Sequence, residues 1–234
     1  MTRDVFMTEF ERIYAPVTVI SDREDKKVLR YRHRTLGRDI LLKLLPEDVP
    51  ICRFLCGIKH ENLPQIYDMI DVGDGFAVLE EFVPGMNIGD VLETGVYSYK
   101  GARKVLIQVC RALSVLHDNG FVHRDIKPDN VIISDDGSVK LVDFDASRSY
   151  SVEKNTDTQV LGTIGYAPPE QYGISQSDPR SDIYAVGVLL NVMVTGKHPS
   201  LRLANGRAGR IVSRCTQINP DQRFTDVKKL MKAM

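Results

Sequence analysis

The chain has 234 residues, enough for one large domain or two small lobes with a core between them. Its 31 Lys and Arg balance its 31 Asp and Glu, so net charge does not favour nucleic acid or an anionic membrane as a partner. There is no long apolar run and no signal peptide, and we expect a cytoplasmic protein. The four cysteines lack zinc-site spacing and are expected to be buried, reduced thiols.

The first third of the chain is predicted to be rich in strands. Short β-branched or alternating runs occur at 16–20, 27–34, 39–45 and 76–82, with charged or glycine-containing connections between them. Between the third and fourth runs, residues 52–68 allow a short helix at most. The expected result is a small lobe built mainly from strands.

Beyond residue 84 the pattern becomes helical. An apolar stripe at helical spacing covers 101–120 and ends at Gly120, a typical C-cap residue. Residues 181–196 are apolar nearly all round, which predicts a helix inside the core, and 224–234 should form a last helix. The sequence therefore indicates an α+β protein with two lobes, and ligands usually bind in the cleft between such lobes.

The densest polar cluster is the stretch HRDIKPDN, followed by KLVDFDASR. A hairpin turn at DDGS should bring Asn130 and Asp143 together, with Asp125 nearby. A carboxylate and an amide oxygen suit Mg²⁺, which takes one or two protein ligands besides phosphate oxygens. Asp125 could then accept a proton from a hydroxyl, and Lys127 could neutralise charge on a transferring phosphoryl group. The cluster predicts phosphoryl transfer.

The motifs HRDIKPDN, DFD and GTIGYAPPE, in this order, resemble the eukaryotic-type serine/threonine protein kinases, in particular compact bacterial members. The resemblance runs from about Tyr14 to the last residue. It implies the bilobal protein kinase fold, with residues 1–83 as the nucleotide-binding lobe and 84–234 as the catalytic lobe. It also implies ATP, Mg²⁺ and a Ser/Thr hydroxyl of a protein substrate, while the oligomeric state is left open.

The resemblance assigns roles residue by residue. Asp125 is the expected catalytic base and Lys127 a contact to the transferred phosphate. Asn130 and Asp143 are the expected metal ligands. Lys43 matches the lysine that holds the α- and β-phosphates of ATP.

Further roles concern the adenine. It is expected between the side chains of Val28 and Leu41 on one side and Ile132 on the other. The backbone of the connecting strand should hydrogen-bond it at Glu81 and Val83.

Other roles are structural or concern the substrate. Thr163 is expected to contact the catalytic aspartate where the substrate lies, and Arg124 resembles the arginine that couples activation-segment phosphorylation to the site. Glu170 is expected to pair with Arg223, and Asp182 to anchor the catalytic loop.

The sequence departs from the family pattern at the phosphate-binding loop. The positions of its three glycines fall on Ser21, Arg23 and Lys26, so backbone N–H groups approach phosphates less easily. We hypothesise that the side chains of Arg23 and Lys26 supply charge instead.

A second departure concerns the partner of Lys43. The motif glutamate falls on Ile51, and the segment around it is too short for the full regulatory helix. Glu80 occupies the position that resembles the gatekeeper, where an unpaired buried carboxylate would cost about 3–5 kcal/mol. We hypothesise that Glu80 pairs with Lys43. The alternatives are a different partner for Glu80 or a solvated carboxylate.

A third departure is Asp145, which stands where the family has glycine. Aspartate tolerates positive φ better than most residues, so Asp145 is interpreted as structural, as part of the metal shell, or as a cause of lost activity.

Two other functions stay open. The lost glycines favour a pseudokinase or nucleotide-binding scaffold, and the short stretch after TGKHP favours a small-molecule kinase.

Overall fold

The computed structural model of the chain describes residues 1–23, 26–150, 165–172 and 177–234. These residues form two compact units. The N-terminal unit comprises Met1–His60 and Pro64–Val83, and the C-terminal unit comprises Glu61–Leu63 and Pro84–Met234. Among the described helices, none has the length and apolar character needed to cross a lipid bilayer.

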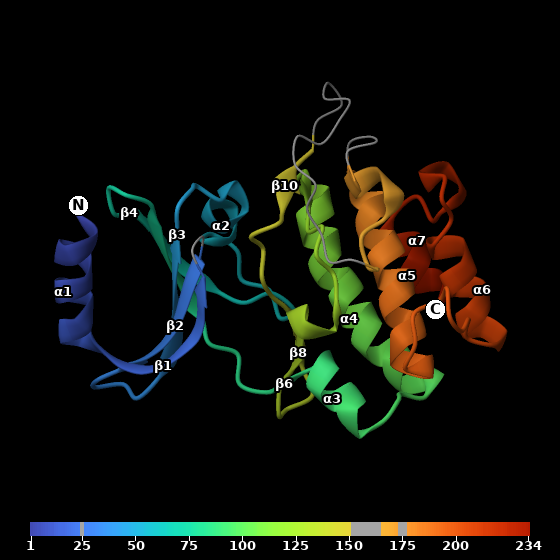
Figure 1. The fold of residues 1–234 in the computed structure, drawn as a ribbon, viewed down its shortest axis with the longest axis horizontal. Coiled ribbons are helices and arrows are strands. Elements are labelled where there is room, and N and C mark those ends of the chain that lie inside the picture. Colours follow the sequence, from blue (N-terminus) through green and yellow to red (C-terminus); the bar gives the residue numbers. More distant parts are fainter. Residues whose placement is uncertain (24–25, 151–164, 173–176) are drawn as a thin grey trace. The chain divides into compact units, whose positions relative to one another are not determined.

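A five-stranded antiparallel sheet forms the centre of the N-terminal unit, in the order β1-β2-β3-β5-β4 (Figure 1). The strands are β1 (Tyr14–Arg23), β2 (Lys26–His33), β3 (Asp39–Leu45), β4 (Ile66–Asp71) and β5 (Phe76–Glu81). The four predicted strands are confirmed, whereas β4 was not predicted. A register shift between Ile66 and Asp68 breaks the alternation that identifies a strand in a sequence.

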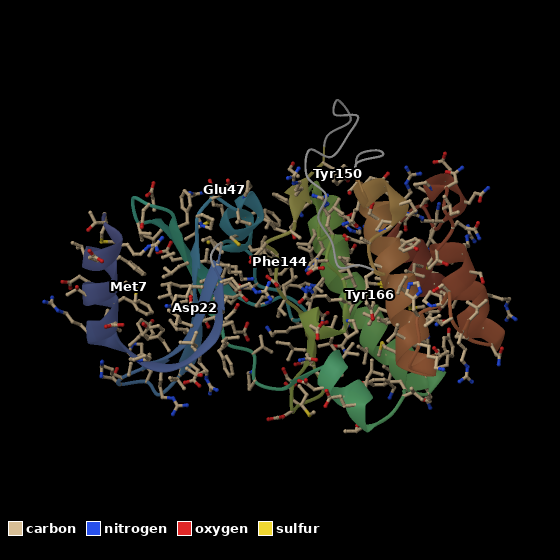
Figure 2. All side chains as sticks on the ribbon, in the orientation of Figure 1. Met7, Asp22, Glu47, Phe144, Tyr150 and Tyr166 are labelled. Atoms are coloured by element: carbon tan, nitrogen blue, oxygen red, sulfur yellow. The ribbon has the colours of Figure 1, made fainter. Side chains whose placement is uncertain are left out.

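Helix α1 (Arg3–Ile13) covers one face of this sheet and was also not predicted (Figure 1). Phe6 and Phe10, one helical turn apart, are buried in the cluster that fills this face, and Met7 packs against it (Figure 2). Phe10 lies against three rings, with centroid distances of 5.5 Å to Phe6, 4.6 Å to Tyr14 and 4.9 Å to Tyr31. Two buried residues among charged ones give too weak a helical period to be recognised.

The two faces of the sheet have different roles because side chains alternate along each strand. The face under α1 is apolar and includes Leu29, Leu42 and Ala77. The opposite face carries the residues next to them in each strand. There Val28 pairs in register with Lys43, which pairs with Val78, while Leu41 pairs with Glu80.

The short helix α2 (Pro50–Leu55) contacts β4. Its six residues agree with the prediction of a short helix at most. Ile51, Cys52 and Leu55 are buried on its inner side, so α2 is held by apolar packing.

The C-terminal unit is mainly helical. Its helices are α3 (Ile88–Thr94), α4 (Tyr99–Asp118), α5 (Pro179–Thr195), α6 (Gly206–Cys215) and α7 (Val227–Ala233). Short strands accompany them, namely β6 (Met86–Asn87), β8 (Val131–Ile133) and β9 (Val139–Leu141) in one sheet, and β7 (Phe121–Val122) with β10 (Arg148–Ser149) in another. Three turns of 3₁₀ helix lie at Pro128–Asn130, Pro169–Tyr172 and Pro220–Gln222.

Helix α5 is buried nearly all round, as predicted, and packs against α4 and α6 (Figure 1). Gly187 allows α6 to come close, since a Cβ at this position would lie 2.3 Å from the Cβ of Cys215. Helix α5 ends at Gly196, which adopts φ +68° as a C-cap. The strongest helical prediction therefore identified the centre of the unit.

The cysteine prediction holds for three of the four residues. Cys52, Cys110 and Cys215 are buried and free, whereas Cys56 is free but half-buried. Burial raises the pKa of Cys110 to about 12, so this thiol is unreactive at neutral pH.

Candidate active site

Asp182 on α5 fixes the start of the loop that is predicted to be catalytic. Its Oδ2 accepts hydrogen bonds from the backbone N–H of His123 (2.9 Å) and from Nε2 of His117 (2.7 Å), and its Oδ1 accepts one from the N–H of Arg124 (2.8 Å). Burial acts to raise the pKa of Asp182, but the hydrogen bond and charge of His117, with His123 and Arg124, hold it below its ordinary value. The expected anchor is present as a buried carboxylate with three donors.

Arg124 adopts a left-handed backbone conformation, with φ +70°. Non-glycine residues adopt this conformation at a cost, and the surroundings must hold them there. Asp182 and Gln171 both hold the backbone of Arg124. The Nε2 of Gln171 donates to the carbonyl oxygen of Arg124 at 2.9 Å. Sequence reasoning missed both Gln171 and His117. The only signal for His117 was its place at the end of an apolar stripe.

Asp125 lies between two donors from its own loop. Its Oδ2 accepts from Lys127 Nζ at 2.7 Å and from Asn130 Nδ2 at 2.9 Å. Asn130 Nδ2 also donates to the backbone oxygen of Asp125 at 2.8 Å. These contacts fix the rotamer of Asp125, and they direct the amide oxygen of Asn130 away from that carboxylate.

The hairpin of β8 and β9 returns the chain to Asn130, as predicted. The backbone N–H of Val142 donates to the carbonyl oxygen of Asn130 at 2.9 Å, so Asp143 follows directly beside Asn130. Asp143 has φ +67°, the second non-glycine residue with positive φ among those described. Among the residues that the structure describes, the two non-glycine residues with positive φ thus fall in the two predicted catalytic segments.

The positive φ expected near Asp145 falls on Asp143 instead. Asp145 is absent from the described residues with positive φ, so aspartate causes no backbone strain where the family has glycine. Between these residues, Phe144 is fully buried and meets the ring of His123 edge-on at 5.4 Å. Burial lowers the pKa of His123, although Asp182, Asp125 and Asp143 act to raise it, and the ring stays neutral at pH 7.

A buried ion pair lies next to α5 in the C-terminal unit. Arg223 donates through both terminal nitrogens to Glu170, at 2.6 and 2.9 Å, and Ser181 donates to the same carboxylate at 2.9 Å. Arg223 also donates to the backbone oxygens of Gln217 and Arg180. The predicted pairing of Glu170 with Arg223 is present, and it ties the 3₁₀ turn Pro169–Tyr172 to the residue that follows the 3₁₀ turn Pro220–Gln222.

In the N-terminal unit, Lys43 and Glu80 form the hypothesised ion pair. Lys43 Nζ lies 2.7 Å from Glu80 Oε2, and the side chains are 6% and 1% exposed. The two residues lie diagonally on adjacent strands and project from the face opposite α1. Ile51, at the position of the motif glutamate, is 1% exposed and apolar. The partner of Lys43 therefore comes from the sheet itself and not from a helix.

The other residues predicted to bind the nucleotide are distributed over the two units. Val28 and Leu41 share the face of Lys43, and Val83 is buried at the end of the N-terminal unit. The backbone N–H of Glu81 donates to the carbonyl oxygen of Gln65 at 2.8 Å, which fixes the end of β5. Ile132 lies on β8 of the C-terminal unit. Their joint role stays a prediction.

The hairpin of β1 and β2 occupies the place of the glycine-rich loop. Arg23 and Lys26 face each other in register at its tip, and Lys27 pairs with Asp22 at 2.9 Å. Both hypothesised cations are therefore at the tip. Thr163, predicted to contact the substrate, lies outside the described residues.

In the described part of the chain, no group of three or more His, Cys, Asp or Glu side chains could hold a metal ion. A Mg²⁺ site does not require such a group, because Mg²⁺ needs only one or two protein ligands when phosphate oxygens supply others. The amide oxygen of Asn130 and the carboxylate of Asp143 fit that requirement.

The chain is similar in sequence to known proteins. Residues 51–233 match the protein kinase domain family. The chain is 39% identical over 150 residues to the probable serine/threonine-protein kinase PknB of Corynebacterium glutamicum, covering 61% of this chain and 23% of that protein. It is 38% identical over 149 residues to the serine/threonine-protein kinase PknL of Mycobacterium tuberculosis, covering 63% and 37%.

A third relative matches over a longer stretch. The probable serine/threonine-protein kinase CPE1738 of Clostridium perfringens is 32% identical over 185 residues, which cover 74% of this chain and 27% of that protein. The matched region is thus about a quarter to little more than a third of the length of these relatives. The family match covers the loop held by Asp182 and most of the chain around it. The chain therefore belongs to the protein kinase family.

Proposed function

We propose that this chain transfers the γ-phosphate of ATP to Ser or Thr hydroxyls of a protein substrate, with Mg²⁺ as the metal. The observation that carries the proposal is the Asp125 carboxylate, held by Lys127 at 2.7 Å and Asn130 at 2.9 Å. A carboxylate held in one rotamer in this way can orient the substrate hydroxyl and accept its proton. Lys127 then neutralises charge on the transferred phosphoryl group.

Asn130 and Asp143 would hold the metal, which when bound neutralises charge on the phosphates. The strained φ of Asp143 supports this role, because it aims the carboxylate from a fixed backbone position. Lys43 binds the α- and β-phosphates, and Glu80 orients Lys43. Glu80 is a positioning residue, since it acts through the lysine.

Several observations support the finer assignments. Val28 and Leu41 from the sheet and Ile132 from β8 would enclose the adenine, with the Glu81 carbonyl and the Val83 backbone as its polar contacts. Arg23 and Lys26 would supply charge to the phosphates from the hairpin tip. The relatives are named serine/threonine-protein kinases, which supports a serine/threonine acceptor, as does the resemblance around Thr163. We place the activity in the cytoplasm, where ATP and Mg²⁺ are abundant.

The test is intact-mass analysis after incubation with Mg-ATP and a generic basic protein. Asp125→Asn removes the base and should slow phosphate transfer by about 10²–10⁴-fold. Asp129→Asn is the matched control, because Asp129 is exposed and lies in the same loop. Equal rates for wild type and Asp125→Asn would overturn the assignment of the base.

The alternative is a nucleotide-binding scaffold without transfer. The observation that favours it is the hairpin tip, where two cations replace glycines. Mg-ATP binding without any phosphate gain on protein would select this alternative. A phosphate gain on an alcohol metabolite, with none on a protein, would instead indicate a small-molecule kinase.

A further inference from the structure

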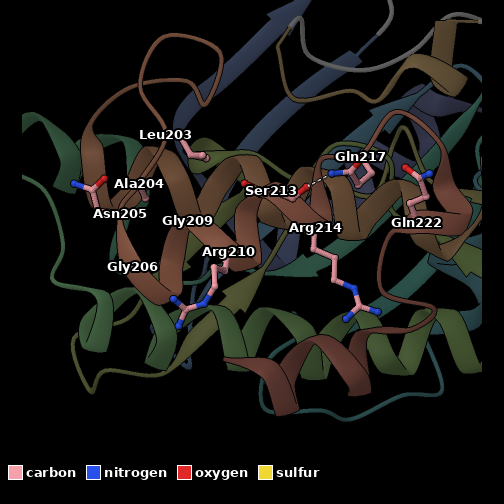
Figure 3. A pocket seen from close by; sticks show the side chains of 10 residues that line it. All are labelled: Leu203, Ala204, Asn205, Gly206, Gly209, Arg210, Ser213, Arg214, Gln217 and Gln222. Atoms are coloured by element: carbon pink, nitrogen blue, oxygen red, sulfur yellow. Dashed lines mark hydrogen bonds between the residues drawn. The ribbon is translucent and has the colours of Figure 1, made fainter.

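A groove of about 780 Å³ runs along α6 in the C-terminal unit (Figure 3). The loop before α6, the helix itself and the chain after it contribute to its wall, including Leu203, Gly206, Gly209, Arg210, Arg214 and Gln217. None of these residues belongs to the proposed catalytic set. The volume is that of a site for a drug-sized ligand or a short peptide segment.

The backbone around the groove is fixed by close packing. A Cβ at Gly209 would lie 2.0 Å from the carbonyl oxygen of Ala204, so glycine is required for the loop to pass this close to α6. Gly206 adopts φ +63° at the start of the helix. The Nε2 of Gln217 donates to the carbonyl oxygen of Ser213 at 2.8 Å, a contact drawn in Figure 3. The groove is therefore a built feature of the fold.

The groove carries positive charge without a matching carboxylate. Arg210 and Arg214 are one helical turn apart, and their side chains extend from the same side of α6 (Figure 3). Arg210 is exposed and forms no hydrogen bond or ion pair with any residue in the described ranges. Arg214 stacks over the ring of Phe224 at 4.3 Å and pairs with no carboxylate in the same ranges.

The sequence around the groove also has an excess of positive charge. Residues 197–234 contain nine Lys and Arg but only two Asp and no Glu, although the whole chain is balanced. Both of these aspartates are engaged, since Asp221 pairs with Arg180 and Asp226 caps α7. An acidic ligand would therefore be attracted to this part of the molecule.

Exposed apolar side chains lie in and next to the groove. Leu203, in the wall of the groove, is 45% exposed, and Ile218, next to Gln217, is 78% exposed. A nucleic acid would leave these aliphatic side chains without a partner. An extended peptide with both acidic and aliphatic side chains would satisfy the arginines and cover the apolar atoms.

We propose that the α6 groove docks an acidic, leucine- or isoleucine-containing segment of a partner protein. This inference goes beyond the proposed phosphate transfer, because binding needs neither ATP nor Asp125. Docking can be measured with Asp125→Asn protein, so failure of docking and failure of catalysis are separate results.

The test is fluorescence anisotropy with a labelled peptide of alternating Glu and Leu. The comparison peptide has Gln in place of Glu. Arg210→Glu/Arg214→Glu should weaken binding of the acidic peptide by about tenfold or more, which corresponds to about 1.4 kcal/mol. Arg103→Glu/Lys104→Glu is the charge-matched control, since both are exposed cations on α4, and it should change binding less than about twofold.

A second variant keeps the test valid if the loss of Arg214 disturbs Phe224. Arg210→Glu alone removes a side chain with no partner among the described residues, and it should still weaken binding by several fold. Equal losses in the groove and control variants would overturn the proposal. So would equal binding of the Gln peptide, or complete competition by an oligonucleotide that binds more tightly than the acidic peptide.

Discussion

The two units of this kinase chain hold their functional charges by different means. In the C-terminal unit, Asp182 fixes the catalytic loop through three hydrogen bonds, from positions that the family motifs specify. In the N-terminal unit, Lys43 is present, but its partner is Glu80 on the neighbouring strand. The C-terminal unit keeps the residue that supports its loop, Asp182. The N-terminal unit keeps Lys43 but not the glutamate that supports this lysine in the family pattern.

The difference has a physical origin. An ion pair needs a fixed distance, and two adjacent strands of one sheet supply it directly because their backbones are hydrogen-bonded together. A glutamate on a helix supplies it only while that helix is docked. With Ile51 on α2 and Glu80 on β5, the position of Lys43 no longer depends on the placement of α2.

The largest effect is expected at Asp182. Asp182→Ala leaves two backbone N–H groups and His117 without their acceptor inside the core, and should lower the free energy of unfolding by on the order of 5 kcal/mol. Asp118→Ala removes an exposed carboxylate that pairs with Lys228, and should cost less than about 1 kcal/mol. Urea denaturation measures both. Similar small losses would show that Asp182 does not anchor the loop.

The ion pair of the N-terminal unit should show strong non-additivity. Lys43→Met and Glu80→Leu each remove one side of this buried ion pair and should cost about 3–5 kcal/mol of unfolding free energy. The double variant replaces both charges with apolar groups and should be more stable than either single variant. Additive losses in the same urea experiment would contradict a direct interaction.

A smaller effect is expected where α1 packs on the sheet. Phe10→Leu keeps an apolar side chain but removes ring contacts to Phe6, Tyr14 and Tyr31, and should cost about 1–2 kcal/mol. Val5→Ala is the control, because Val5 is 53% exposed on the same helix. Equal melting temperatures for the two variants would show that α1 adds nothing to the unit.

The smallest effect concerns pH. The folded pKa of His123 lies below the unfolded value of 6.5, so below that pH the unfolded chain binds a proton that the folded chain does not. The free energy of unfolding should therefore fall as pH decreases from about 7.5 to about 5.5. His123→Phe should make this decrease shallower, and an unchanged slope in urea titrations would contradict a neutral, buried His123.

Much of the C-terminal unit could be predicted from sequence because its chemistry is local. Asp125, Asn130 and Asp143 stand in short motifs, and the hairpin between them has a recognisable turn. Gln171 could not be found, since its contact with Arg124 joins residues far apart in the chain. Helix α6 was missed because Gly209, which disfavours a helix, is required by the nearby Ala204 carbonyl.

In the N-terminal unit, the strands and the Glu80–Lys43 pair were predictable for different reasons. The strands follow from alternation, while the pair follows from the cost of an unpaired buried carboxylate. The cover provided by α1 was not predictable. Phe6 and Phe10 alone do not establish an amphipathic helix, and nothing in the sequence indicates that the sheet needs a helix on that face.

The rate of phosphate transfer from Mg-ATP by Glu80→Gln is the most direct test of the Glu80–Lys43 pair. This variant keeps the volume of the side chain and removes its charge, so Lys43 loses its ionic partner while the sheet is retained. The control is Glu61→Gln, an exposed carboxylate paired with Arg111. Glu80→Leu, followed by Mg-ATP binding, extends the test to complete loss of the acceptor.

If Glu80 orients Lys43, kcat/KM for ATP should fall on the order of 10–100-fold in Glu80→Gln, because misplacing a group that positions the phosphates slows transfer strongly. Glu61→Gln should keep the wild-type value. A wild-type kcat/KM in folded Glu80→Gln, together with unchanged ATP binding in Glu80→Leu, would contradict the role assigned to the pair.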